Sequence, residues 1–260
     1  MTADDTVPLR ERVLLPMAVT IGLALIWQAL SYFQLFPKAA FPSPLDVVQG
    51  FREEITTGRM LNDVIASLFR VACSFVVAVV LAIPVGLWMG HRVRARIALA
   101  PALNFFRCLS PLAWIPFTIL WFGIGDAAAI FLIFMSIFFS LVLTTMSAVS
   151  HIPTVYFRAA HDYGFHGTEL LTKVTLPAIM PQIITALRVT AGIAWLVVVA
   201  AEMFQAGGTG LGGAIWDARN GLRNDIIAVE MITIGAIGVG LDRLLAQLTR
   251  VPSVRWGYDR

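Results

Sequence analysis

Several ionisable side chains fall inside long apolar stretches of the sequence, where a charge requires either a partner or water. Arg107 is followed by Ser110-Pro111 and by Pro116, and helical hydrogen bonding should be interrupted there because each proline removes a backbone donor. Irregular backbone at membrane depth occurs where it faces protein or a wet cavity. Arg107 therefore has two interpretations. It is either a cation that lines a solute pathway and attracts an anion, or a strut paired with a carboxylate or with freed carbonyls.

Other charges in apolar stretches suggest pairs. Arg188 and Asp242 fall at similar depths, roughly 9–11 Å from one membrane face at about 1.5 Å per residue, which predicts a structural ion pair. Glu202, Glu230 and Arg70 all lie toward the outer ends of their segments, on the other side of the membrane. Either carboxylate could pair with Arg70 or contribute to an outer gate. The residues that could line a pathway are Arg107, Ser110, Glu202 and, between the two proline breaks, Trp114.

Residues for bond-making chemistry are lacking. The glycine-rich run at residues 207–213 has no lysine after it, and the pattern G-x-x-x-x-G-K-[ST] does not occur in the chain. A turn that lets the chain re-enter the protein is expected there instead. The four histidines fall in two polar loops without metal-type spacing, and Cys73 and Cys108 are expected to be reduced packing residues. We expect no catalytic residue, no metal site and no cofactor bound by this chain, which is not an enzyme.

The composition indicates what must position these residues. Charged residues make up 13% of the 260 and apolar residues 58%, against about 25% charged in a soluble domain. Six apolar segments are each long enough to cross a bilayer: residues 13–33, 64–90, 98–123, 127–148, 181–206 and 226–248. The sequence predicts an all-α integral membrane protein of about six transmembrane helices, with residues 1–260 as a single domain. The basic residues form no single face, which excludes nucleic acid as a partner.

Basic residues are unevenly distributed between the two sides of this arrangement. With the N-terminus in the cytoplasm, ten Lys and Arg residues fall on the cytoplasmic side and five on the other. Cytoplasmic loops are enriched in these residues, so both termini are predicted to be cytoplasmic. Residues 44–58 are expected to form a short amphipathic helix after Pro44, on the outer side.

The longest cytoplasmic loop, residues 149–180, has the pattern of a helix–glycine–helix hook. Pro153 should open the first helix, Gly164 should end it, and Thr168 could cap the second. The small pair Ala159-Ala160 allows another surface to approach closely, and glycine permits a turn with positive φ. Periodicity alone does not distinguish this hook from a plain surface loop.

The spacing within this loop resembles the coupling motif of ATP-binding-cassette (ABC) importer permeases. That motif has Glu-Ala-Ala, three residues, Gly, nine residues, a branched aliphatic, one residue, then Leu-Pro. Ala159, Ala160, Gly164 and Val174 fall in register, as do Leu176 and Pro177, whereas Arg158 replaces the glutamate. Residues 107–126 and 192–212 are similar to the branch of this family that transports nitrate, sulfonates, taurine and bicarbonate, and so is the Gly-Leu-Asp-Arg ending at residues 240–243.

This resemblance implies a permease subunit in the bacterial inner membrane that carries a small anion or organic anion. A second permease copy would complete the pathway, most simply as a homodimer. Cytoplasmic ATPase subunits that bind ATP and Mg would receive the coupling helix, with contacts at Arg158, Ala159, Ala160, Gly164, Leu176 and Pro177. A periplasmic or lipid-anchored solute-binding protein would deliver the solute.

Two other classes of membrane protein share some of these features. A secondary, ion-coupled transporter would also be helical with buried charges, but it usually shows internal repeats, and none is found in this sequence. A membrane-embedded enzyme would need a nucleophile or metal cluster near one face, and only the loop histidines are available.

Overall fold

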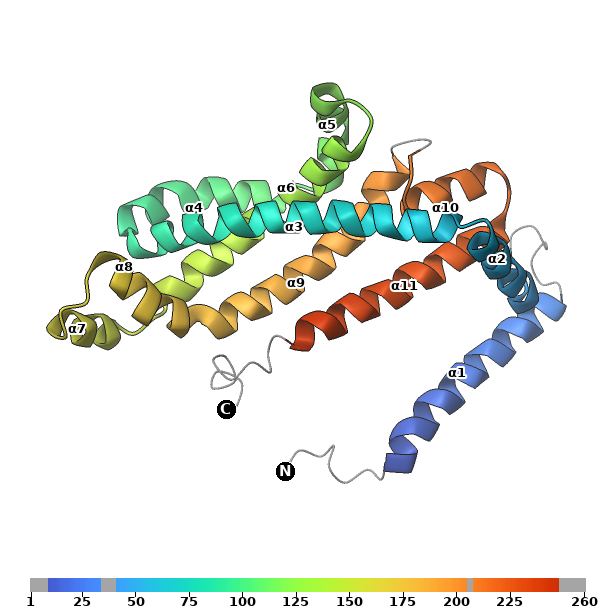
Figure 1. Cartoon of the computed structure of the whole chain (residues 1–260), viewed down its shortest axis with the longest axis horizontal. Coiled ribbons are helices and arrows are strands. Elements are labelled where there is room, and N and C mark those ends of the chain that lie inside the picture. Colours follow the sequence, from blue (N-terminus) through green and yellow to red (C-terminus); the bar gives the residue numbers. More distant parts are fainter. Residues whose placement is uncertain (1–8, 34–40, 205–207, 248–260) are drawn as a thin grey trace.

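A computed structural model of the chain describes residues 9–33, 41–204 and 208–247, without the side chains of residues 9–13 and 16. Every regular element in these ranges is a helix (Figure 1). The helices are α1 (Leu9–Tyr32), α2 (Pro44–Thr56), α3 (Arg59–His91), α4 (Val93–Cys108), α5 (Ile115–Phe122), α6 (Asp126–Ser150), α7 (Thr154–Asp162), α8 (Gly167–Leu170), α9 (Leu176–Met203), α10 (Leu211–Asn220) and α11 (Asn224–Ala246).

Four helical runs in the described residues are long and apolar enough to cross a membrane: Arg59–His91, Asp126–Ser150, Gly167–Met203 and Asn224–Ala246. The bent pair Val93–Cys108 and Pro111–Phe122 makes a fifth if it counts as one span. The apolar part of α1 described here, Met17–Tyr32, is shorter than these. The structure thus confirms an all-α membrane fold, with four or five clear spans where six were expected.

The span expected over residues 98–123 is broken into two helices. Leu109 and Ser110 are extended, with ψ angles of 134° and 127°, and a 3₁₀ turn at Pro111–Trp114 leads into α5. The two halves meet at 89°. The break itself was predicted and has the expected cause, because Pro111 and Pro116 lack backbone donors. What the pattern did not reveal is that the break turns the chain by a right angle.

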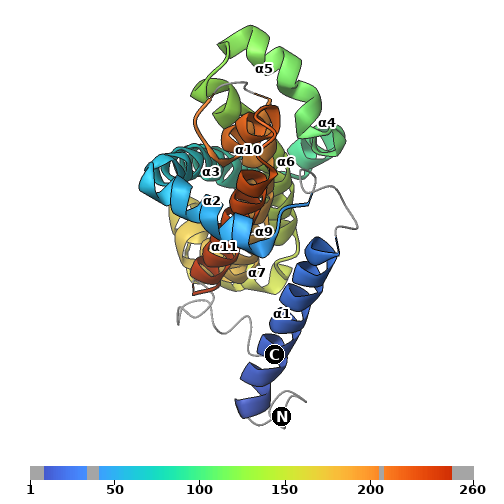
Figure 2. The same ribbon diagram turned by 90° about the vertical axis from the view of Figure 1, so that its right-hand side faces the viewer.

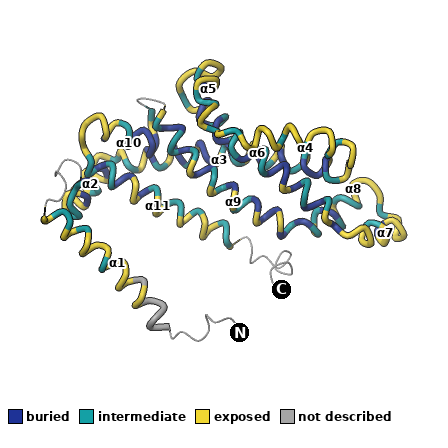
Figure 3. The backbone as a smooth tube through the Cα atoms, turned by 180° about the vertical axis from the view of Figure 1, so that it is seen from behind, coloured by how far each residue is buried: buried dark blue, intermediate teal, exposed yellow. Residues whose placement is uncertain are grey.

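Aromatic side chains hold this bent arm against α6. The ring of Phe106 stacks on Phe139 at 5.2 Å between centroids, and Trp114 lies 6.3 Å from Phe106 and 6.2 Å from Trp121. Figure 2 shows α5 projecting at the edge of the bundle, and Figure 3 shows exposed residues along α4 and α5. Trp114 therefore occupies an aromatic packing contact at the bend.

The centre of the bundle is the contact between α3 and α6, where small residues let two backbones approach closely. They recur at every fourth position along α3: Ala78, Ala82, Gly86 and Gly90. A Cβ atom added at Gly86 would lie 2.8 Å from the carbonyl oxygen of Val142. Such small-residue stripes drive helix association in lipid, where helices gain no hydrophobic energy from contact with one another.

The amphipathic helix expected at residues 44–58 is α2, which packs across α11 and the start of α3 (Figure 1). Ser43 caps it, since its Oγ accepts from the Asp46 amide at 3.2 Å while the Asp46 carboxylate accepts from the Ser43 amide at 2.9 Å. Arg223 donates to Glu53 at 2.7 Å and thereby lowers the pKa of that carboxyl. These contacts fix α2 at the end of the bundle opposite α7 and α8.

Candidate functional site

The hook, defined here as residues 154–170 (α7, the turn after it and α8), projects from one end of the bundle (Figure 1). Pro153 immediately precedes α7, as predicted. Gly164 ends the helix with φ of +80°. Its amide donates to the His161 carbonyl at 2.9 Å, and the Phe165 amide donates to the Ala160 carbonyl at 2.9 Å. This pair of bonds is the Schellman arrangement, whose left-handed position favours glycine.

The second half of the hook differs from the prediction. Thr168 does not cap α8: the residue before the helix is His166, and no side chain caps it. After a single turn, α8 continues through a π-helical turn, Leu171–Thr175, into α9. The second hook helix is therefore the beginning of the next span, which runs from Gly167 to Met203. Leu176 and Pro177 lie inside that continuous helix and not at a loop boundary.

The small pair of the hook faces two directions. Ala160 is 5% exposed and packs inward, whereas Arg158 and Ala159 are exposed on the outer side of α7. The backbone rotates about 100° per residue in a helix, so Ala160 can face inward while Ala159 remains exposed. Of the two alanines, Ala159 is the one available to another subunit.

The C-terminal end of α3 contacts the hook and the π-helical turn that follows it. His91 Nδ1 lies 2.9 Å from the Leu87 carbonyl oxygen, and Nε2 lies 3.2 Å from Thr175 Oγ1 in the π-helical turn. The His91 ring also meets the Phe157 ring of α7 edge to face at 5.9 Å. A displacement of the hook therefore acts directly on α3 and α9. The sequence signalled none of these contacts.

A buried charge network occupies the opposite end of the bundle. The Arg70 side chain is 4% exposed and lies 2.6 Å from Glu202 Oε1, 2.7 Å from Asp126 Oδ1 and 2.5 Å from the Thr209 carbonyl oxygen. The predicted pairing of Arg70 with a carboxylate is confirmed for Glu202. Glu230 is not its partner, and neither Glu230 oxygen has a hydrogen-bond partner in the described residues.

The glycine-rich segment is anchored by this same network. Amides from the start of α10 donate to side chains of α3 and α9: Gly210 to Asp63 at 2.7 Å, Leu211 to Ser67 at 3.0 Å and Gly212 to Glu202 at 3.0 Å. From Gly208 onward the segment is a turn back into the protein, as expected, and its amides donate to two carboxylates and one hydroxyl of the chain itself. Gly207 lies outside the described residues.

The remaining candidate charges lie on the surface of the single chain. Arg188 and Asp242 form the predicted pair, with the Arg188 Nε atom 2.7 Å from Asp242 Oδ1. Arg107 is exposed in the last turn of α4, and Ser110 is exposed in the break that follows. Arg107 forms no hydrogen bond or ion pair with the described part of the chain. An intrachain strut is therefore not observed for Arg107 among the described residues.

Comparison with known proteins fits this architecture. The family model for the binding-protein-dependent transport system inner membrane component matches residues 82–251. The chain is 36% identical over 256 residues to the bicarbonate transport system permease protein CmpB of Synechococcus elongatus, covering 92% of this chain and 89% of that protein. It is 31% identical over 252 residues to the taurine transport system permease protein TauC of Escherichia coli, covering 94% and 90%.

A further relative and a solved structure agree. The nitrate import permease protein NrtB of Leptolyngbya laminosa is 33% identical over 241 residues, covering 89% of this chain and 85% of that protein. An inward-facing structure of the MetNI methionine ABC transporter shares the fold, with a TM-score of 0.58 at 22% identity over 75% of this chain and 99% of that chain. The resemblance seen in the hook spacing is confirmed: this chain belongs to the family of binding-protein-dependent transport system inner membrane components, the permeases of ABC importers.

Proposed function

We propose that this permease forms, with a second copy of itself, the pathway by which a small anion or small organic anion enters the cell. Nitrate, bicarbonate and sulfonates are the candidate solutes, because they are close in chemistry to what the relatives are named for. The observation that carries the proposal is the hook, whose glycine turn at Gly164 and exposed Arg158 and Ala159 fit a surface that docks into another subunit. Residues 1–260 act as one membrane domain.

The orientation follows from the basic residues at the hook end. Arg92, Arg94 and Arg96 lie where α3 meets α4, next to the hook with its Arg158 (Figure 1). Basic residues are retained on the cytoplasmic side, so the hook faces the cytoplasm, where ATP is available. Both termini then lie in the cytoplasm. Four of the basic residues on which the predicted orientation depends lie outside the described residues: Lys38, Arg250, Arg255 and Arg260.

The partners follow from this orientation. Arg158, Ala159 and Gly164 of the hook contact a cytoplasmic ATPase that binds ATP and Mg, and so does Pro177, which is exposed, while Ala160 and Leu176 hold the hook in place from inside. A solute-binding protein, periplasmic or lipid-anchored, docks at the end that carries α2 and α10. The chain performs no hydrolysis itself.

Purification and reconstitution test this assignment. The tagged chain, purified in mild detergent from its own host, should retain two ATPase copies per permease pair. In proteoliposomes, uptake of nitrate, bicarbonate or taurine should require ATP and the solute-binding protein. Uptake that follows an ion gradient without any ATPase would instead identify a secondary transporter.

Arg107 provides a second test. Its exposed guanidinium lies beside the helix break, about 13 Å from the cytoplasmic start of the predicted span at 1.5 Å per residue. Arg107→Ala should reduce uptake at least about ten-fold, because one lost charge contact at depth is worth more than about 1.4 kcal/mol. Arg107→Lys keeps the charge but lacks the planar guanidinium, so its uptake should lie between that of the wild type and that of Arg107→Ala. Wild-type uptake by Arg107→Ala at normal expression would remove Arg107 from the pathway.

A further inference from the structure

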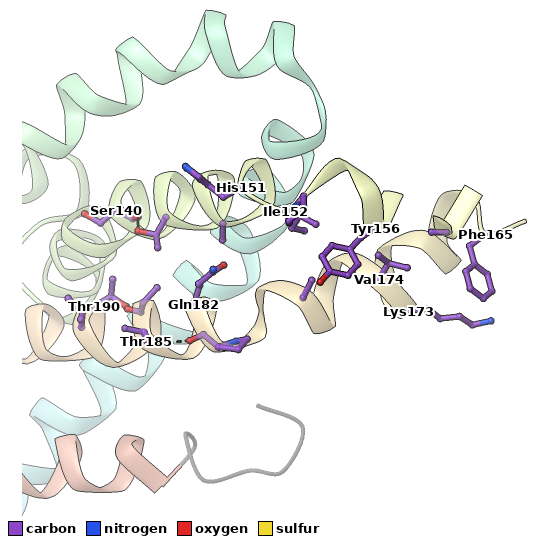
Figure 4. A pocket seen from close by; sticks show the side chains of 18 of the residues that line it. Ser140, His151, Ile152, Tyr156, Phe165, Lys173, Val174, Gln182, Thr185 and Thr190 are labelled. Carbon is purple, nitrogen blue, oxygen red and sulfur yellow. Dashed lines mark hydrogen bonds between the residues drawn. The ribbon is translucent and has the colours of Figure 1, made fainter. Parts of the chain in front are cut away.

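A groove of about 1160 Å³ runs along the seam between α6 and α9. It begins at Ser140 of α6 and Ile193 of α9, deep in the spans, and reaches Phe165 and Lys173 at the hook (Figure 4). Ser140 lies ten residues before the end of α6, which corresponds to about 15 Å of helix. The groove thus covers about half of a hydrocarbon core about 30 Å thick and opens at the end that carries the hook.

Polar side chains gather in this groove although both helices are otherwise apolar. Ser140 and Thr144 come from α6, and Gln182 and Thr185 from α9. The hydroxyls of Thr144 and Thr185 donate to carbonyls of their own helices, at 2.8 Å and 3.0 Å. A row of such groups at three- and four-residue spacing places them on one side of each helix.

Gln182 is the group that the fold leaves unused. Its side chain is exposed and points from α9 into the space between α9 and α6 (Figure 4). The amide makes no hydrogen bond to the described residues of this chain. An amide facing lipid without a partner is strongly unfavourable, so this side of α9 does not face lipid. A volume of about 1160 Å³ holds far more than a few waters at about 30 Å³ each.

The charges around the groove select the kind of solute. Among the described residues that line it, no aspartate or glutamate occurs, and Lys173 is the only Lys or Arg. Lys173 is already engaged, 2.9 Å from Glu169 Oε1 and 4.8 Å from the centre of the Phe165 ring. A cation would find no carboxylate among the described lining residues, whereas an anion can accept from the Gln182 amide and meets no lining carboxylate that would repel it.

We propose that the groove is the inward-opening half of the solute pathway and that the Gln182 amide donates to the anion as it leaves toward the cytoplasm. This inference rests on the proposed importer function and names residues for it. None of Arg107, Ser110, Trp114 and Glu202 lines the groove. The pathway then passes the faces of α6 and α9 that carry Ser140, Thr144, Gln182 and Thr185.

Accessibility to a thiol reagent tests the proposal without relying on transport. In a chain lacking Cys73 and Cys108, single cysteines replace Gln182, Thr185 or, as a control, Leu196, which is 72% exposed on α9 and outside the groove. A membrane-impermeant methanethiosulfonate is added to inside-out vesicles that contain the whole transporter. We expect Gln182→Cys and Thr185→Cys to react about ten-fold or more faster than Leu196→Cys, because thiolate forms in water and not in lipid. Equal rates at the three positions would overturn the proposal.

A charge substitution tests the role of the amide. Gln182→Glu should lower anion uptake about ten-fold or more, because a carboxylate repels the anion at close range, whereas Gln182→Asn keeps the amide and should retain most uptake. Labelled cysteines together with normal uptake by Gln182→Glu would overturn the assignment of Gln182. If the cysteine-free chain shows ATP-dependent uptake but Gln182→Cys and Thr185→Cys are not labelled, the groove proposal fails and the importer function stands. If ATP-dependent uptake is absent in the wild type, the importer function fails first.

Discussion

Glu202→Ala should destabilise the permease by about 3–5 kcal/mol, the usual effect of removing one partner from a buried ion pair. The Glu202 side chain is 1% exposed and Arg70 is 4% exposed, so the remaining guanidinium would stay buried with only part of its charge balanced. Glu202 also accepts from Ser67 at 2.8 Å and from the Gly212 amide at 3.0 Å. Its loss should therefore release α10 from α3 and α9 as well.

Thermal unfolding of the purified complex in detergent measures this effect. Glu202→Gln keeps an acceptor of the same shape and should lose less stability than Glu202→Ala. The control is Glu169→Ala, which removes an exposed pair with Lys173 in the hook and should cost about 0.3–0.5 kcal/mol. If Glu202→Ala unfolded at the same temperature as Glu169→Ala, the network would carry no stability.

Gly164→Val should uncouple ATP hydrolysis from uptake while leaving the spans folded. A Cβ at Gly164 meets nothing within 4 Å, so the effect comes from the backbone alone. At a φ of +80° a residue with a Cβ costs about 1–2 kcal/mol, and more when β-branched. The hook can relieve this strain by unwinding its last turn, which moves Arg158 and Ala159. If the displaced hook docks on the ATPase less favourably by about 1.4 kcal/mol, docking weakens about ten-fold. We therefore expect the ratio of solute imported to ATP hydrolysed to fall about ten-fold.

Two substitutions separate strain in the hook from strain in general. Gly164→Asn should remain close to wild type, because asparagine tolerates the left-handed conformation. Gly58→Val carries the same kind of strain between α2 and α3, with φ of +73° and no atom within 4 Å of an added Cβ. It should lower stability without changing the coupling ratio. Coupling lost equally in Gly58→Val and Gly164→Val would mean that the hook has no special role.

Crosslinking tests which face of the hook contacts the ATPase. Because Ala160 is 5% exposed, a cysteine there should not reach the ATPase, whereas Ala159→Cys should crosslink to it. The absence of a crosslink from position 159 to any position of the ATPase would remove the basis for calling the hook a coupling helix.

Features set by local backbone chemistry were predictable from the sequence. The apolar runs predicted six spans, and four of them are long helices in the described residues, because about 20 apolar residues in a row have no other stable state in lipid. The end of α7 at Gly164 and the break after Arg107 follow from the steric rules for glycine and proline. The Arg188–Asp242 pair was predictable as well, since both residues lie at similar depth in separate spans.

The tertiary structure alone decided which groups meet. Sequence position could not choose between Glu202 and Glu230 as the partner of Arg70, because the choice depends on how α9 and α11 pack on α3. The same holds for Ala160 facing inward, for the carboxylates that bind the glycine-rich segment, and for the groove around Gln182. Helix formation is governed by hydrogen bonds between residues four apart. Ser67 and Leu211, in contrast, are hydrogen-bonded to each other although they lie 144 positions apart in the sequence. A contact between residues so far apart in sequence depends on how all the intervening helices pack. The hydrophobic periodicity of the sequence does not specify that packing.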